Sequence, residues 1–182
     1  MSSNITIGLA LGSGSARGWS HIGIIRELAE LGIVPNIVCG TSVGALVGAS
    51  YISGNFNKLE DWACSLTKLE AAKFFDINFS LRGFVNVEKF HRFLNEYVAS
   101  DDALIENYQK QYAAVATELA SGREVWLMKG SIVEAVWSSI SLPSLFLRCN
   151  PRAIYRKSPS RNRDLSLPRQ MLLPPGPSLC DG

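Results

Sequence analysis

Two short apolar runs near the N-terminus each end in a glycine-rich turn, and each turn is followed by a helical pattern. "ITIGLAL" (residues 5–11) leads into "GSGSARG", and "IVPNIVC" (residues 33–39) leads into "GTSVG" and a helix of small residues that Gly54 ends. The helical pattern between the two runs consists of Ile22, Ile25, Leu28 and Leu31. Strands and helices that alternate in this order predict an α/β fold with a parallel sheet and right-handed crossovers.

The following segments predict further helices and one hairpin. Residues 58–75 and 87–100 read as amphipathic helices. One face of the second helix carries Phe90, Phe93, Leu94 and Tyr97. "QYAAVATEL" and "EVWLMK" flank the turn signal "ASGR", which predicts an antiparallel hairpin. A last helix is expected from Ser131, its N-cap, to a stop just before Pro143.

The composition favours a globular cytoplasmic protein. The chain has 182 residues, of which 47% are hydrophobic and 19% charged. It shows no secretory signal and no run of about 18 apolar residues, so we expect any membrane contact to be peripheral, at the inner face. The four cysteines form no C-x-x-C pair, which argues against a disulfide framework or a zinc site. Metal ions and cofactors are expected to be absent.

The chain changes character near residue 147. Residues 147–182 carry a net charge of +5 and six of the eight prolines, whereas residues 1–146 carry a net charge of −3. This change predicts a domain over residues 5–146 and a disordered, basic, proline-rich tail over residues 147–182. A tail of this kind can contact an anionic surface, but no nucleic-acid partner is expected.

Ser42 stands in a G-x-S-x-G pattern where an apolar strand meets a helix. Gly40 and Gly44 allow a sharp turn there, as in a nucleophile elbow, and the helix directs its free N–H groups to any negative charge beside the serine oxygen. The alternative is that these glycines only let the helix pack closely on the strand. Residues 12–18 present backbone N–H groups to a phosphate or to an oxyanion. A nucleotide site is the weaker hypothesis, because no G-K-[ST] closes the loop and no acidic residue follows the second strand.

The two motifs and their flanks, "LALGSGSARGWSHIGIIRELAELGI" and "IVCGTSVGALVGA", resemble the patatin-like phospholipase family, close to its bacterial members and to the catalytic domain of neuropathy target esterase. The resemblance covers residues 5–146. It implies a three-layer α/β fold, in which helices flank a mainly parallel sheet and whose C-terminal part is missing here. It also implies a serine hydrolase of phospholipids or other lipid esters, with a Ser-Asp dyad and no cofactor.

Carried over residue by residue, the resemblance makes Ser42 the catalytic serine, with Gly40 and Gly44 in its elbow. The oxyanion loop would consist of Gly12, Ser13, Gly14, Ser15, Arg17 and Gly18. The family pattern is G-G-G-x-[RK]-G, so Ser13 and Ser15 depart from glycine, but a serine keeps the backbone donor. Arg17 either steers anionic head groups or forms an ordinary salt bridge.

The catalytic base is the element that the sequence does not supply clearly. The chain holds only His21 and His91, neither in the place of a triad histidine; we expect His21 to order the loop at most and His91 to be a surface residue. The resemblance implies an aspartate in D-G-G or D-G-A soon after "SISLPSLF". Only Asp164 and the terminal Asp181-Gly182 follow, without that context. Two hypotheses stay open: an active serine lipid hydrolase, or a truncated, inactive relative that folds poorly or acts only as a binding protein.

Overall fold

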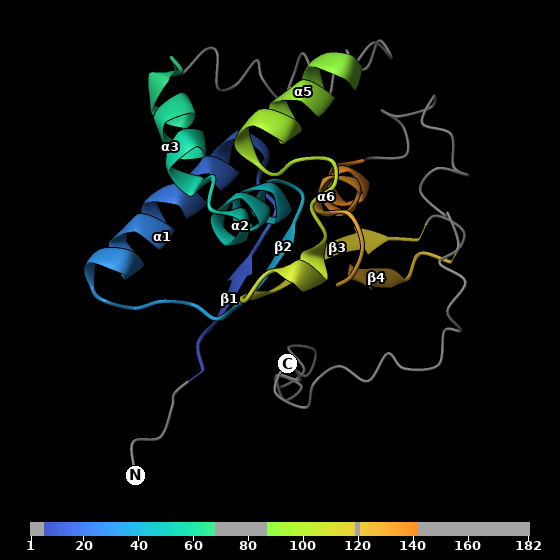
Figure 1. The fold of residues 1–182 in the computed structure, drawn as a ribbon, viewed down its shortest axis with the longest axis horizontal. Coiled ribbons are helices and arrows are strands. Elements are labelled where there is room, and N and C mark those ends of the chain that lie inside the picture. The colour runs from blue at the N-terminus through green and yellow to red at the C-terminus, as the bar shows by residue number, and fades with distance from the viewer. Residues whose placement is uncertain (1–5, 68–86, 119–120, 142–182) are drawn as a thin grey trace, which may run out of the picture. The chain divides into compact units, whose positions relative to one another are not determined.

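The computed structural model describes residues 6–67, 87–118 and 121–141. In these ranges four strands form one sheet in the order β1-β2-β3-β4 (Figure 1). The strands are β1 Gly8–Leu11, β2 Ile37–Thr41, β3 Gln111–Thr117 and β4 Glu124–Leu127. The first three strands are parallel and β4 is antiparallel to β3. The predicted α/β fold with a mainly parallel sheet is confirmed.

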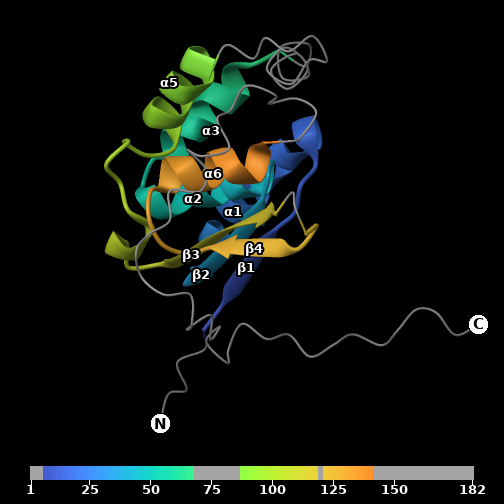
Figure 2. The ribbon, with the colours of Figure 1, turned by 90° about the vertical axis from the view of Figure 1, so that its right-hand side faces the viewer.

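Helices connect these strands on one side of the sheet. The helical segments are η1 Ser15–Trp19, α1 Ser20–Glu30, α2 Val43–Ser53, α3 Phe56–Ser65, α5 Val87–Tyr97, η2 Ile105–Asn107 and α6 Ile132–Ile140. The chain steps from β1 to β2 to β3 in one direction, so right-handed crossovers place the connecting helices on the same face. Figure 2 shows α2 and α6 together above the sheet, where α2 contacts β2 and α6 contacts β3. The second helix layer of the predicted three-layer fold stays a prediction.

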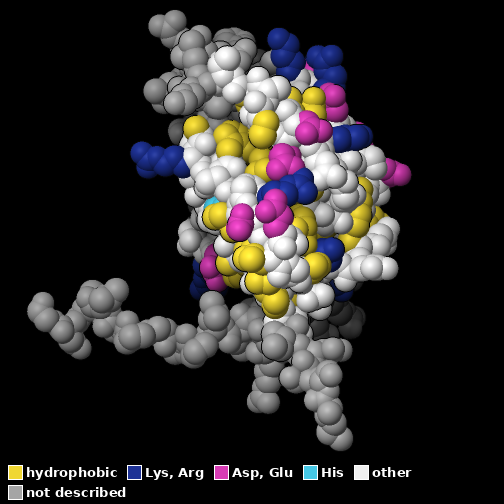
Figure 3. Space-filling view, turned by 90° about the vertical axis from the view of Figure 1, so that its left-hand side faces the viewer, with side chains coloured by type: hydrophobic (Ala, Val, Ile, Leu, Met, Phe, Trp, Pro, Cys, Tyr) yellow, Lys and Arg dark blue, Asp and Glu magenta, His cyan; other side chains and the backbone are white. Residues whose placement is uncertain are grey.

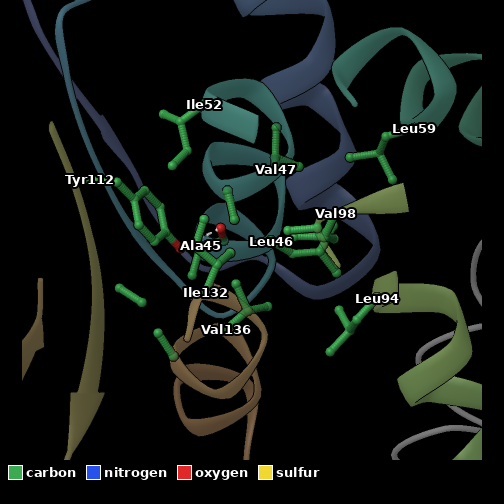
Figure 4. Close-up of a cluster of buried hydrophobic side chains, with 14 of the residues drawn as sticks. Ala45, Leu46, Val47, Ile52, Leu59, Leu94, Val98, Tyr112, Ile132 and Val136 are labelled. Carbon is green, nitrogen blue, oxygen red and sulfur yellow. Dashed lines mark hydrogen bonds between the residues drawn. The ribbon is translucent and has the colours of Figure 1, made fainter. Parts of the chain in front are cut away.

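The core forms around α2, whose residues are apolar or small on every side. A helix of this kind has to be buried on all faces, and α2 lies between the sheet, α3 and α6. Figure 4 shows its Leu46 and Val47 among side chains of α3, α5 and α6. Tyr112 of β3 is also buried here, and its hydroxyl donates a hydrogen bond to the Ala45 carbonyl at 2.8 Å. Burial raises the pKa of Tyr112, so the phenol stays a neutral donor.

Most of the turns and helix ends predicted from local sequence patterns are present in the structure. The hairpin of β3 and β4 forms, and the Ser131 hydroxyl caps α6 by accepting the Glu134 N–H at 3.2 Å. Gly54 ends α2 with φ +83°. On α5, the side chains of Phe90, Phe93 and Leu94 are buried. The C-terminal part of the predicted helix 58–75, and the predicted stop at Pro143, lie outside the described residues.

Several bounds of the prediction were wrong: β1 starts at Gly8 and not at residue 5, and the helix predicted over residues 87–100 ends at Tyr97. β2 starts at Ile37 and not at residue 33, because Pro35 has no N–H for a strand ladder, and it continues through Gly40 to Thr41. Leu31, predicted on the buried face of the first helix, is 64% exposed, because α1 ends one residue before it. Figure 3 shows the side of the molecule with α1 and α3, where hydrophobic side chains lie among acidic and basic ones. No helix in the described ranges is both long and apolar enough to cross a membrane.

Candidate active site

Ser42 is the turn residue between β2 and α2. Its φ of 54° and ψ of −119° are unfavourable for a residue with a side chain, and such a conformation persists only where the surroundings hold it. The Ser42 carbonyl accepts the Leu46 N–H at 3.1 Å, so it already belongs to the first turn of α2. Within the described residues its hydroxyl has no hydrogen-bond partner. The serine therefore stands at the carboxyl end of β2 with a free hydroxyl, as a nucleophile elbow requires.

The two glycines of the motif make room for this turn. A Cβ on Gly40 would overlap the Gly44 carbonyl and come within 2.5 Å of the Ala45 nitrogen. A Cβ on Gly44 would overlap the Leu11 carbonyl oxygen and lie 2.6 Å from that of Gly12. Both positions face backbone atoms, which cannot rotate away as a flexible side chain can. The absence of side chains at Gly40 and Gly44 is therefore a steric requirement.

The glycine-rich loop, residues 12–18, packs against the same turn. Leu11 of β1 is in register with Gly40 of β2, and the two strands are parallel, so the loop leaves the sheet at the edge where Ser42 lies. At its far end Gly18 is buried against Val43, where a Cβ would lie only 2.8 Å from that of the valine. The loop is thus in contact with the start of α2 at both of its ends.

The middle of the loop is exposed and carries free donors. The Arg17 N–H binds the Gly14 carbonyl at 3.0 Å, but no described residue accepts a hydrogen bond from the N–H of Ser13 or Gly14. His21 Nε2 lies 2.8 Å from the Gly12 carbonyl oxygen, which accepts its hydrogen bond, so this histidine orders the loop. Among the described residues Arg17 has no ion-pair partner. The loop can therefore present N–H groups and one cation to an anionic ligand.

Ser15 has φ +48°, which disfavours any residue with a Cβ. We expect Ser15→Gly to stabilise the chain by about 0.5–1 kcal/mol, because relief of this strain exceeds the added freedom of the unfolded chain. Ser13→Gly is the matched control: Ser13 has no positive φ, so its replacement brings only the entropic cost. Thermal denaturation of both variants measures the difference. Equal shifts in Tm for the two variants would contradict the prediction.

Neither histidine is hydrogen-bonded to Ser42, and the thiol of Cys39, on the strand before it, is not a rival nucleophile. His21 is bound to Gly12, and His91 pairs with Asp101 at 2.9 Å on the far helix α5. Burial raises the pKa of Cys39, on β2, so this residue remains a protonated thiol. The two aspartates considered as the base, Asp164 and Asp181, lie outside the described residues.

Ser139 is a neighbour of Ser42 that sequence reasoning missed. Its hydroxyl accepts a hydrogen bond from the Ser42 N–H at 2.8 Å and donates one to the Val115 carbonyl at 2.6 Å. The same carbonyl accepts the Thr41 hydroxyl at 3.0 Å. The segment "SISLP", which begins with Ser139, is the signal in the sequence that points to this position. Nowhere in the described ranges do three or more His, Cys, Asp or Glu residues form a group that could hold a metal ion.

Comparison with known proteins gives one family and several relatives. The family described as "Patatin-like phospholipase" matches residues 9–182, across the predicted boundary at residue 147. An NTE-family protein of Mycobacterium tuberculosis is 36% identical over 144 residues, which are 79% of this chain and 39% of that protein. Human patatin-like phospholipase domain-containing protein 6 is 30% identical over 153 residues, 81% of this chain and 11% of the human protein.

A third relative, the neuropathy target esterase sws of Drosophila persimilis, is 30% identical over 142 residues, 75% of this chain and 10% of that protein. All three alignments therefore include most of the chain but only a minor part of the relative. The chain spans 39% of the length of its mycobacterial relative. The division into a domain over residues 5–146 and a tail over residues 147–182 stays a prediction.

Proposed function

This chain belongs to the patatin-like phospholipase family, and we propose that it is a serine lipid acyl hydrolase whose nucleophile is Ser42. The observation that carries the proposal is the strained backbone of Ser42, a residue with φ 54° between β2 and α2, packed against a loop with free N–H groups. Strain of this kind is found where an active site needs a fixed, exposed side chain. The substrate class proposed is a phospholipid or another lipid ester, in keeping with the family name.

In the proposed reaction a base removes the proton of the Ser42 hydroxyl while the oxygen attacks the ester carbonyl carbon. The tetrahedral intermediate expels the alcohol, which takes up the proton, and leaves an acyl group on Ser42. Water, activated by the same base, then releases the carboxylic acid and restores the serine. The family relationship supports an aspartate as this base, and both histidines of the chain have other partners. Asp164 and Asp181 do not stand in a D-G-G or D-G-A motif, so we expect the chain as given to turn over slowly.

The negative charge on the intermediate needs donors that are free before the substrate arrives. The N–H of Ser42 cannot be one of them, because Ser139 accepts it at 2.8 Å. The N–H groups of Ser13 and Gly14 have no partner among the described residues, and we assign them this role. The positive end of the α2 dipole adds to the stabilisation. Arg17, exposed and without a described ion-pair partner, would attract an anionic head group.

A second candidate is an inactive protein that binds lipid without cleaving it. This alternative is favoured by one observation: no described carboxylate or histidine is hydrogen-bonded to the Ser42 hydroxyl. A serine without a base keeps its elbow and loop but reacts slowly. Contact with a membrane surface, and a cytoplasmic location at its inner face, remain predictions for either candidate.

The test of the proposed function is the replacement Ser42→Ala. We expect hydrolysis of a lysophospholipid and of a p-nitrophenyl ester to fall to the uncatalysed background, and a fluorophosphonate probe to label the unaltered chain at Ser42 alone. Ser65→Ala is the matched control, since Ser65 is an exposed helical serine on α3 whose hydroxyl bonds only the Trp62 carbonyl. Hydrolysis that persists in Ser42→Ala would refute the proposal. Lipid binding without any hydrolysis would favour the second candidate.

A further inference from the structure

Three serines lie close together at the end of α6, and the hydroxyl of one of them forms hydrogen bonds to residues distant in the sequence. The hydroxyl of Ser138 donates to the Glu134 carbonyl at 2.8 Å, and that of Ser141 donates to the Trp137 carbonyl at 2.8 Å. Both are the ordinary local bonds of a helical serine to the residue four positions earlier. Ser139 instead bonds residues that are 24 and 97 positions away along the chain. Its hydroxyl is thus used for tertiary structure.

The helical repeat explains why only Ser139 reaches Ser42. Positions 132, 136 and 139 share one face of α6, and Ile132 and Val136 on that face are completely buried. In Figure 4 these two side chains point toward α2, the helix that Ser42 begins. Ser138 lies about 100° away around the helix and bonds back to the exposed Glu134. Ser139 is therefore the serine that α6 presents to the elbow.

The two bonds of Ser139 use the proton of its hydroxyl and one of its acceptor sites. A serine hydroxyl has one proton and can accept at its lone pairs. The proton goes to the Val115 carbonyl on β3, so the oxygen is left to accept the N–H of Ser42. This N–H precedes the first turn of α2 and would otherwise have no helical partner. Through Ser139, the strained turn is joined to α6 and β3 at once.

We propose that Ser139 is a positioning residue, whose hydroxyl holds the backbone of Ser42 in the conformation that directs its side chain to the substrate. The role in catalysis rests on the proposed function, since it requires Ser42 to be the nucleophile. With the Ser42 N–H held by Ser139 and its carbonyl by Leu46, the backbone on both sides of the reacting side chain is fixed. A small displacement of a nucleophile is costly to the rate, because attack requires a defined approach to the carbonyl carbon.

The deciding experiment is site-resolved amide hydrogen exchange of the full chain by NMR. In Ser139→Ala we expect the Ser42 amide to exchange about tenfold faster, the effect of losing one hydrogen bond, while the Tyr112 amide in β3 is unchanged. Ser138→Ala is the matched control and should leave the Ser42 amide as it is. An unchanged Ser42 amide in Ser139→Ala overturns the proposal. An equal acceleration of Ser42 and Tyr112 also overturns it, because it shows only a general loss of stability.

A second variant keeps the test decisive if Ser139→Ala does not fold. Ser139→Cys has nearly the same shape, but a thiol is a weaker donor and acceptor. We therefore expect the Ser42 amide to be accelerated selectively in this variant too, by a smaller factor.

Measurement of ester turnover tests the role of Ser139 in catalysis. We expect kcat to fall about tenfold in Ser139→Ala with KM unchanged. A raised KM with unchanged kcat would contradict a positioning role. If Ser42→Ala hydrolyses esters normally, the proposed function fails, whereas the amide result, which needs no catalysis, still stands or falls by itself.

Discussion

Replacement of Gly44 by alanine is expected to destabilise the chain by at least about 3 kcal/mol, because the new methyl group meets backbone atoms and no flexible side chain. The Cβ would overlap the carbonyl oxygen of Leu11 and lie 2.6 Å from that of Gly12. Either β1 with its loop or the first turn of α2 has to move. For a domain of this size the expected fall in Tm is roughly 10 °C, and hydrolysis should be lost with it.

Gly23→Ala is the matched control for this prediction. Gly23 also lies inside a helix, α1, but it is exposed and a Cβ there would meet nothing within 4 Å. Because alanine is the better helix former, this variant should be slightly more stable, by up to about 1 kcal/mol. Thermal denaturation followed by circular dichroism measures both variants. If Gly44→Ala melts at the same temperature as the unaltered chain, the close contact between loop and elbow is wrong.

A chain that receives a well-placed aspartate base is expected to hydrolyse a p-nitrophenyl ester about 10² to 10⁴ times faster than the chain as given. A serine hydroxyl is a weak nucleophile until a base takes its proton, and oxyanion donors do not replace that step. The measurement compares kcat for the unaltered chain with kcat for a version whose residues after 146 are replaced by the corresponding segment of a family member with its D-G-G motif. Ser42→Ala in the second version should abolish the gain.

The two aspartates of the predicted tail provide the controls. Asp164→Ala and Asp181→Ala are expected to leave the slow turnover of the unaltered chain unchanged. The opposite result would be high turnover in the unaltered chain and its loss in Asp181→Ala. In that case Asp181 is the base, the terminal Asp-Gly is the second half of the dyad, and the hypothesis of an inactive relative is wrong.

Local sequence signals determined much of the fold, because the forces behind them act over a few residues. The alternation of apolar runs and helical patterns predicted the parallel strands and their helices, and Ser131 and Gly54 marked helix ends by capping chemistry that is local. The glycine spacing around Ser42 likewise predicted a sharp strand-to-helix turn, and the positive φ of that residue agrees with it. The start of β2 was predicted too early, although the missing N–H of Pro35 that delays it is also a local signal.

What holds Ser42 in place was decided only by the tertiary structure. Ser139 is 97 residues away along the chain, and although the helical repeat puts it on the buried face of α6 with Ile132 and Val136, no local rule tells which distant group that face meets. Only the packing of α6 against α2 and β3 makes its hydroxyl an acceptor for the Ser42 N–H. The steric role of Gly44 also depends on the parallel register that brings Leu11 beside Gly40. Residue types and spacing specify which groups can react or bond, but the distance between two such groups depends on how separate elements pack.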